Sequence, residues 1–190
     1  MNELSATSKK MSIKKISFKQ LVWLFFVVFF IHNIEEFLSF PSWLEENISA
    51  IPLFLSSKIA LVFHYNFIFF IAIALSLATL LPLFICIWAN KTKNKQITIF
   101  LLLTIAWVMM LNAFQHIFNT LIMNEYTPGL ITALLINLPF SIYFILRLKK
   151  EKAISKMKLF LYLPIGLVAY FLSVAAILLI SYNILNFIKP

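Results

Sequence analysis

The sequence is poor in the residues that a soluble domain needs. Only 12% of its 190 residues are charged and only two are glycine, whereas 62% are hydrophobic. A soluble domain has about 25% charged residues, and one core of this size cannot hide so large an apolar excess. Most of these side chains must therefore face lipid. The absence of an internal repeat further disfavours a solenoid or an inverted-repeat transporter.

Cysteine and scattered charge are also scarce. The single cysteine, Cys86, lies inside an apolar run, so no disulfide forms within the chain and the redox compartment stays open. The net charge of +9 does not indicate nucleic-acid binding, because the lysines gather in short segments between the apolar runs. Basic residues placed in this way orient a membrane protein.

What the chain does contain is long apolar runs. A helix needs about 20 apolar residues to cross a bilayer, and five stretches qualify: 21–40, 59–88, 97–123, 130–146 and 159–188. The sequence therefore predicts an all-α, polytopic membrane helix bundle with five transmembrane helices. We expect a basic tail at 1–20 and a single bundle over 21–188.

The basic residues predict the orientation of this bundle. Most of them lie in the tail, in the connection between the second and third runs, and in the connection between the fourth and fifth. By the positive-inside rule the N-terminus is cytoplasmic and the C-terminus lies outside. The first run is not expected to be a cleaved signal peptide, because no small-residue cleavage site follows it. The segment 41–58 is predicted to lie along the outer surface as a short helix or lid.

A few polar residues interrupt the apolar runs. His32, Glu35 and Glu36 lie in the first run, and Asn112 and His116 lie in the third. A charged group at the bilayer centre costs roughly 2.5–3.5 kcal/mol on insertion scales. At a rise of about 1.5 Å per residue, both groups fall in the outer half of the membrane. His64 and Thr132 are expected in the same layer.

Helical spacing places these groups on common faces. Residues three or four positions apart lie on one side of a helix, so His32 can act with either glutamate, and Asn112 and His116 are one turn apart. Two neighbouring buried carboxylates cannot both ionise cheaply. A shared proton, a histidinium partner or a metal ion would relieve that conflict, and each is a functional device.

Three ordered motifs resemble one family. His32-Asn33-Ile34-Glu35-Glu36 matches the signature of the HXXEE domain family of bacterial integral membrane proteins, whose function is unknown. The family's N-x-x-x-H and Y-x-P-G-x-x-T patterns match Asn112 to His116 and Tyr126 to Thr132. The resemblance adds Tyr126 and Thr132 to the candidate site. One family arginine is missing, because Gln96 occupies its place and only Lys95 and Lys93 are near it.

Each motif also has a purely structural interpretation. The first can be a buried hydrogen-bond network that fixes helix packing, and Asn112 with His116 can hold helices together. Tyr126 to Gly129 has the composition of a turn, since Pro128 presets one turn position and Gly129 supplies a positive φ. His64 matches no motif and is interpreted as a packing histidine, held in reserve as a ligand.

These residues support three functional hypotheses. The first is a hydrolase or related lipid enzyme of the cell membrane, in which His32, His116 and Glu36 (or Glu35) bind a divalent metal such as zinc and the other glutamate acts as base. The second is metal-free Glu/His acid–base chemistry on a lipid or isoprenoid substrate of the outer leaflet. The third is a proton- or cation-coupled transporter or channel, or a non-catalytic membrane accessory protein. The full set of candidate catalytic residues is His32, Glu35, Glu36, Asn112, His116, Tyr126 and Thr132.

Overall fold

The computed structural model describes residues 16–47 and 67–188, and this part of the chain contains helices and no strand. Five helical stretches are long and apolar enough to cross a membrane. They are α1 (Phe18–Asn47), α3 (Phe67–Lys91), α4 (Lys95–Met123), a composite stretch Leu130–Lys150, and α7 (Lys156–Ile188). The predicted all-α, five-helix membrane fold is confirmed. The side of the membrane on which each terminus lies stays a prediction.

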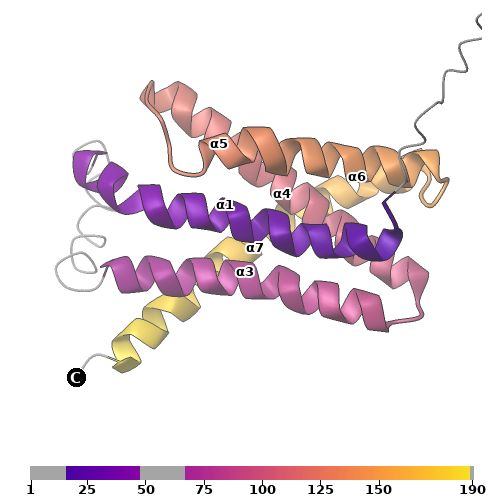
Figure 1. Cartoon of the computed structure of the whole chain (residues 1–190), viewed down its shortest axis with the longest axis horizontal. Coiled ribbons are helices and arrows are strands. Elements are labelled where there is room, and N and C mark those ends of the chain that lie inside the picture. Colours follow the sequence, from indigo (N-terminus) through magenta and orange to yellow (C-terminus); the bar gives the residue numbers. More distant parts are fainter. Residues whose placement is uncertain (1–15, 48–66, 189–190) are drawn as a thin grey trace, which may run out of the picture.

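The helices differ in how deeply they lie in the bundle. In the most apolar stretch of α1 and of α4, 39% of the residues are buried inside the bundle. In the corresponding stretches of α3 and α7, only 11% are buried. α1 packs along α3, and α4 packs against both α7 and the composite stretch. Figure 1 shows α7 crossing the bundle obliquely. Many large apolar side chains are exposed on the outside, as a lipid-facing surface requires.

The most tightly packed part of the core surrounds Phe25 on α1. Its ring is completely buried and makes edge-on contacts with Phe140 and Phe144, each at a centroid distance of 4.8 Å. Such aromatic pairs add to the energy of apolar burial. They fix α1 against the composite stretch and thereby set the position of the polar residues farther along α1.

The first helix is longer than predicted. It continues past residue 40 through Pro41 and ends at Asn47. The prediction of a separate surface helix or lid over 41–58 is therefore wrong for residues 41–47, and the remainder lies outside the described residues. An internal proline costs a helix one backbone hydrogen bond, and membrane helices tolerate this where neighbours or side chains compensate.

The composite stretch is not a uniform α-helix. It consists of α5 (Leu130–Thr132), the π-helical segment η2 (Ala133–Asn137) and α6 (Leu138–Lys150). The Leu138 amide donates to the Ala133 carbonyl five residues back, and Pro139, at the start of α6, has no amide proton to donate. Such π-segments often occur at functional sites, and this one directly follows Thr132.

The other predicted boundaries need smaller corrections. The third run begins two residues earlier, at Lys95, and the fifth begins three earlier, at Lys156. The fourth extends to Lys150, and the second ends at Lys91. Residues 59–66 of the predicted second run, including His64, lie outside the described residues. Basic residues thus end or begin these helices, which suits the edge of a bilayer.

Candidate functional site

Three ionisable side chains converge where the C-terminal halves of α1 and α4 meet. His32 and Glu36 are one turn apart on α1, and His116 comes from α4. Glu36 Oε1 lies 3.1 Å from His116 Nε2 and 3.7 Å from His32 Nε2. The two imidazole rings are 5.0 Å apart, nearly perpendicular. Both histidines of this His–Glu–His cluster are buried, whereas the Glu36 side chain is 19% exposed.

Gly129 closes one side of the His–Glu–His cluster. Its φ is +85°, a backbone conformation that glycine adopts without strain. A Cβ atom at this position would lie 2.9 Å from carbon atoms of His32, Glu36 and His116 alike. The turn therefore approaches the cluster as closely as its backbone permits. Glycine is needed here for two reasons, the positive φ and the space that the cluster occupies.

The neighbouring Glu35 belongs to a different set of contacts. Its carboxylate accepts hydrogen bonds from the Tyr126 hydroxyl at 2.6 Å, the Ile131 amide at 3.1 Å and the Thr132 amide at 2.7 Å. The first amides of a helix have no partner within the helix, and Gly129 offers no side chain to cap them. Glu35 on α1 thus caps α5, and the negative charge suits the positive end of the helix dipole.

Tyr126 lies in the turn before this stretch. Burial, together with the hydrogen bond to the Glu35 carboxylate, raises the pKa of Tyr126. The phenol therefore keeps its proton and remains a donor to Glu35 at physiological pH. In this position Tyr126 fixes the turn and does not reach the two histidines through any contact that the structure describes.

Thr132 connects the two sets of contacts. Its amide donates to Glu35, and its Oγ1 lies 2.8 Å from His32 Nδ1. The single hydroxyl proton of Thr132 is directed to the Gly129 carbonyl at 3.4 Å. When the hydroxyl donates to Gly129, Oγ1 accepts a hydrogen bond from the Nδ1–H group, and in this tautomer the lone pair of His32 is on Nε2, facing Glu36. A hydrogen bond of this kind orients a metal-binding histidine.

His116 is held by residues that the sequence did not single out. The Thr127 hydroxyl lies 3.2 Å from the His116 carbonyl, to which it donates, and 2.8 Å from the Thr120 hydroxyl. Thr127 is 3% exposed. Its place inside the Y-x-P-G-x-x-T pattern was the only feature of the sequence that could have indicated this role, because threonine is common in turns.

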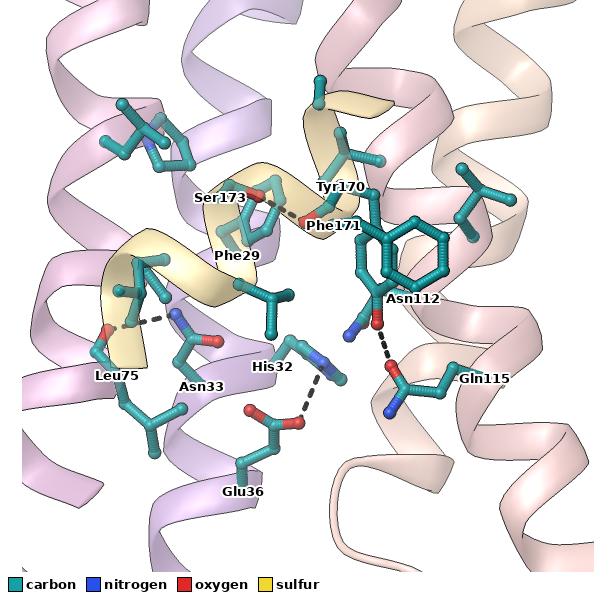
Figure 2. Close-up of a pocket in the computed structure, with 18 of the residues that line it drawn as sticks. Phe29, His32, Asn33, Glu36, Leu75, Asn112, Gln115, Tyr170, Phe171 and Ser173 are labelled. Atoms are coloured by element: carbon teal, nitrogen blue, oxygen red, sulfur yellow. Dashed lines mark hydrogen bonds and ion pairs between the residues drawn. The ribbon is translucent and has the colours of Figure 1, made fainter. Parts of the chain in front are cut away.

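A large apolar cavity adjoins the His–Glu–His cluster. It has a volume of about 1120 Å³ and lies among α1, α3, α4 and α7, with His32, Glu36 and Asn112 in its wall. Figure 2 shows Glu36 directed toward His32, and Tyr170 and Gln115 facing each other beside Asn112. The Tyr170 hydroxyl donates to Gln115 Oε1. Sequence reasoning missed Gln115 and Tyr170, because a lone polar side chain in an apolar run resembles interhelical packing.

The donor set fits a metal ion. One atom each from His32, Glu36 and His116 can be chosen so that all lie within 4.8 Å of one another, and neither Nε2 atom has an aligned hydrogen-bond partner among the described residues. Zinc bonds of about 2.0–2.1 Å in tetrahedral geometry separate ligands by about 3.3 Å, close to the 3.1 and 3.7 Å observed. Two imidazoles and a carboxylate form a ligand set of open catalytic zinc sites.

The structure thus brings together most of the predicted site residues, in two groups. The first comprises His32, Glu36 and His116, with Asn112 nearby in the cavity wall. The second comprises Glu35, Tyr126 and Thr132. Gln96, at the family's arginine position, is the second residue of α4. It lies sixteen residues before Asn112, about 24 Å away along the helix. Lys93 and Lys95 lie at that same end, so none of the three can touch the His–Glu–His cluster.

These observations define a multi-pass helical membrane protein with a buried His–Glu–His cluster beside an apolar cavity. The chain belongs to the family described as proteins of unknown function with an HXXEE motif, whose family model matches residues 23–144. It is similar to YrkK of Bacillus subtilis (strain 168), described as an uncharacterised protein, with 30% identity over 121 residues, or 60% of this chain and 69% of YrkK. No solved structure matches the chain.

Proposed function

We propose that this protein is a membrane-embedded enzyme of the cell membrane that hydrolyses a lipid-like substrate with the help of a divalent metal ion such as zinc. The observation that carries the proposal is the convergence of His32, Glu36 and His116 at the wall of an apolar cavity. Buried ionisable groups in membrane helices usually serve function. A cavity with a few convergent polar groups is also the usual form of a small-molecule site.

His32, Glu36 and His116 would hold the ion, and Thr132 would keep His32 in the tautomer that binds it. The ion would supply Lewis acidity and a water of lowered pKa. Glu36 meets both histidines through Oε1, so its Oε2 would remain free to hold a proton. The apolar cavity would hold the substrate chain, with the scissile ester or amide bond beside Asn112.

The predicted orientation gives this reaction a place in the membrane. If the N-terminus is cytoplasmic, the site lies in the outer half of the bilayer, because His32 is at the middle of α1 and Glu36 and His116 lie in the second halves of α1 and α4. Leu121 and Phe118 line the cavity and are also 73% and 62% exposed. The cavity therefore reaches the lipid-facing surface of α4, through which a substrate of the outer leaflet would enter.

A metal-free acid–base enzyme is the second candidate, and one distance favours it. Glu36 Oε1 and His116 Nε2 are 3.1 Å apart, within the range over which a general acid and base exchange a proton. In this alternative Glu36 and His116 would shuttle a proton on a lipid or isoprenoid substrate, and no metal would be needed.

The two candidates are separated by metal content and activity. The full chain is purified in detergent without chelators, its zinc content is measured by mass spectrometry, and hydrolysis of long-chain esters is assayed after reconstitution. Glu36→Gln and His116→Ala should lose both zinc and activity. Glu125→Gln is the matched control, because Glu125 is an exposed glutamate in the turn after α4.

About one zinc per chain in the wild type and in Glu125→Gln, and none in the two site variants, would support the proposal. Correctly folded protein that binds no metal in any preparation would overturn it and leave the acid–base alternative. Proton flux across liposomes that depends on Glu36 would overturn both and indicate a transporter.

A further inference from the structure

The wall of the cavity carries very little charge. Eight of its lining side chains are polar or ionisable, namely His32, Asn33, Glu36, Thr104, Asn112, Gln115, Tyr170 and Ser173. No lysine or arginine is found among the described residues that line it. The one carboxylate, Glu36, faces the two histidines. Phosphate-binding sites, in contrast, rely on arginine, lysine or a helix N-terminus.

The polar atoms in the wall suit an uncharged partner. Asn112 Oδ1 is buried beside His32 and makes no well-aligned hydrogen bond within the described part of the chain. Beside it, the Tyr170 hydroxyl donates to Gln115 Oε1, which leaves the Gln115 amide as a donor. One unpaired acceptor and one donor at the wall match a hydroxyl and a carbonyl group. Leaving such a buried acceptor unpaired is costly, so a ligand that donates to Asn112 would bind more tightly.

The shape of the cavity adds a long chain to this partner. Apart from these few polar groups, the cavity is lined by aliphatic and aromatic side chains of four helices, and its volume is about 1120 Å³. This is slightly above the range of about 300–1,000 Å³ for small-molecule sites. The space therefore suits an extended aliphatic chain better than a compact polar molecule.

Resting on the proposed function, we infer that the substrate class is an uncharged long-chain lipid with hydroxyl and ester or amide groups, and not a phosphorylated lipid. The chain lies in the cavity, and the polar end meets Asn112 and Gln115 next to the His–Glu–His cluster. Hydrolysis adds water across the ester or amide bond: the hydroxyl joins the acyl carbon, and the proton goes to the leaving oxygen or nitrogen.

The helix α7 decides which chain fits. The family match covers residues 23–144, whereas α7 spans Lys156–Ile188 and lies beyond it. α7 nevertheless contributes Tyr170, Phe171, Ser173 and five aliphatic residues to the cavity wall. The His–Glu–His cluster therefore lies within the residues that the family model matches. The section of the cavity wall that α7 contributes lies outside them.

Two probes that differ only in a phosphate test this inference. The first is a monoacylglycerol with a diazirine in its chain, and the second is the lysophosphatidic acid with the same chain. Photolabelling of the full protein in lipid nanodiscs is measured with zinc and after chelation, so that binding is observed without turnover. We expect the monoacylglycerol to label at least ten times more, and the labelled peptides to come from α4 and α7.

Two pairs of variants locate the labelling. Ala169→Trp narrows the cavity and should reduce labelling by the monoacylglycerol at least fivefold, whereas Leu172→Trp, on an exposed position of α7 that does not line it, should not. Asn112→Leu should reduce the preference for the monoacylglycerol without a loss of folding, which circular dichroism checks. Thr98→Val, at the far end of α4, is the control for that helix.

Equal or stronger labelling by the lysophosphatidic acid would overturn the inference. Loss of that labelling in Lys58→Gln would identify Lys58, which lies outside the described residues, as the partner of the phosphate. Loss of that labelling only after chelation would identify the metal ion as the partner. Selective labelling by the monoacylglycerol in a protein that binds no zinc would leave this inference standing and overturn the metal-assisted function, so the two fail separately.

Discussion

Glu35 and Glu36 are adjacent in the chain and have different surroundings. The Glu35 carboxylate accepts three hydrogen bonds from the turn and the start of α5. The Glu36 carboxylate faces two buried imidazoles and the cavity. Adjacent helix positions point about 100° apart around the axis, so neighbouring residues reach different elements. One motif thus supplies both a cap for α5 and the carboxylate of the His–Glu–His cluster.

This difference bears on which of the two glutamates serves the proposed reaction. A carboxylate that already accepts three hydrogen bonds has little capacity left for a metal or a substrate. The hypothesis of a free second glutamate acting as base therefore does not fit Glu35. Glu36 is left as the ligand and proton acceptor of the proposed reaction, with Glu35 as a residue that positions α5 and, through Thr132, His32.

The largest expected effect separates the two glutamates directly. Glu36→Gln should weaken zinc binding by more than about 100-fold, because losing a ligand costs more than losing the residue that orients one. Glu35→Gln should keep zinc affinity within about tenfold. Calorimetric titration of zinc into chelated protein measures both. Similar losses in the two variants would remove the distinction between the two carboxylates.

Thr132 should show an intermediate effect, because it belongs to both sets of contacts. Thr132→Val keeps the shape of the side chain and removes the acceptor for His32 Nδ1. Zinc affinity should fall by about 10–100-fold, and Thr132→Ser should restore most of it. Thr98→Val, a buried threonine at the other end of α4, is the control. Unchanged affinity in Thr132→Val would show that this hydrogen bond does not orient His32.

Glu35→Ala should mainly reduce stability. It leaves the first amides of α5 without a cap and removes a charged acceptor, at a cost of about 3 kcal/mol in the free energy of unfolding. The melting temperature in detergent should fall by several degrees, whereas Glu36→Ala should change it much less. A melting temperature equal to that of the wild type would contradict the capping role of Glu35.

The smallest effect concerns Tyr126 and depends on pH. Tyr126→Phe should cost about 1 kcal/mol or less, because the pair is partly exposed. Burial and the bond to Glu35 raise the pKa of Tyr126, so the folded protein holds this proton more tightly than the unfolded chain does. The stabilisation is therefore complete below the ordinary tyrosine pKa of about 10 and is lost as the pH rises through the folded-state value.

This effect is measured by melting curves of the wild type and Tyr126→Phe, recorded from pH 7 to above about pH 10. We expect a constant difference up to about pH 10, followed by convergence. A difference that shrinks already between pH 7 and 9 would show that the Tyr126 hydroxyl does not stabilise the fold by donating to Glu35.

Several features of the site were predictable from single residues. The free-energy cost of placing ionisable side chains in apolar runs indicated a shared site for His32, Glu35, Glu36 and His116. The 3.6-residue helical period placed His32 and Glu36 on one face. Thr127, Gln115 and Tyr170 were not predictable as site residues. Thr127 and Gln115 occupy unspecified positions inside the motifs, and Tyr170 is a lone polar side chain in an apolar run. Their importance depends on contacts that the sequence does not reveal.

The sequence by itself determined that the chain is a five-helix membrane protein, because the energy of burying apolar groups in lipid depends on composition and length alone. It also predicted how far along each helix the polar residues lie, since a helix rises by a fixed amount per residue. Only the tertiary structure decided that Glu35 caps α5, that Glu36 meets both histidines and that α7 completes the cavity. Those outcomes depend on how the helices rotate and cross, which is fixed by packing between distant segments.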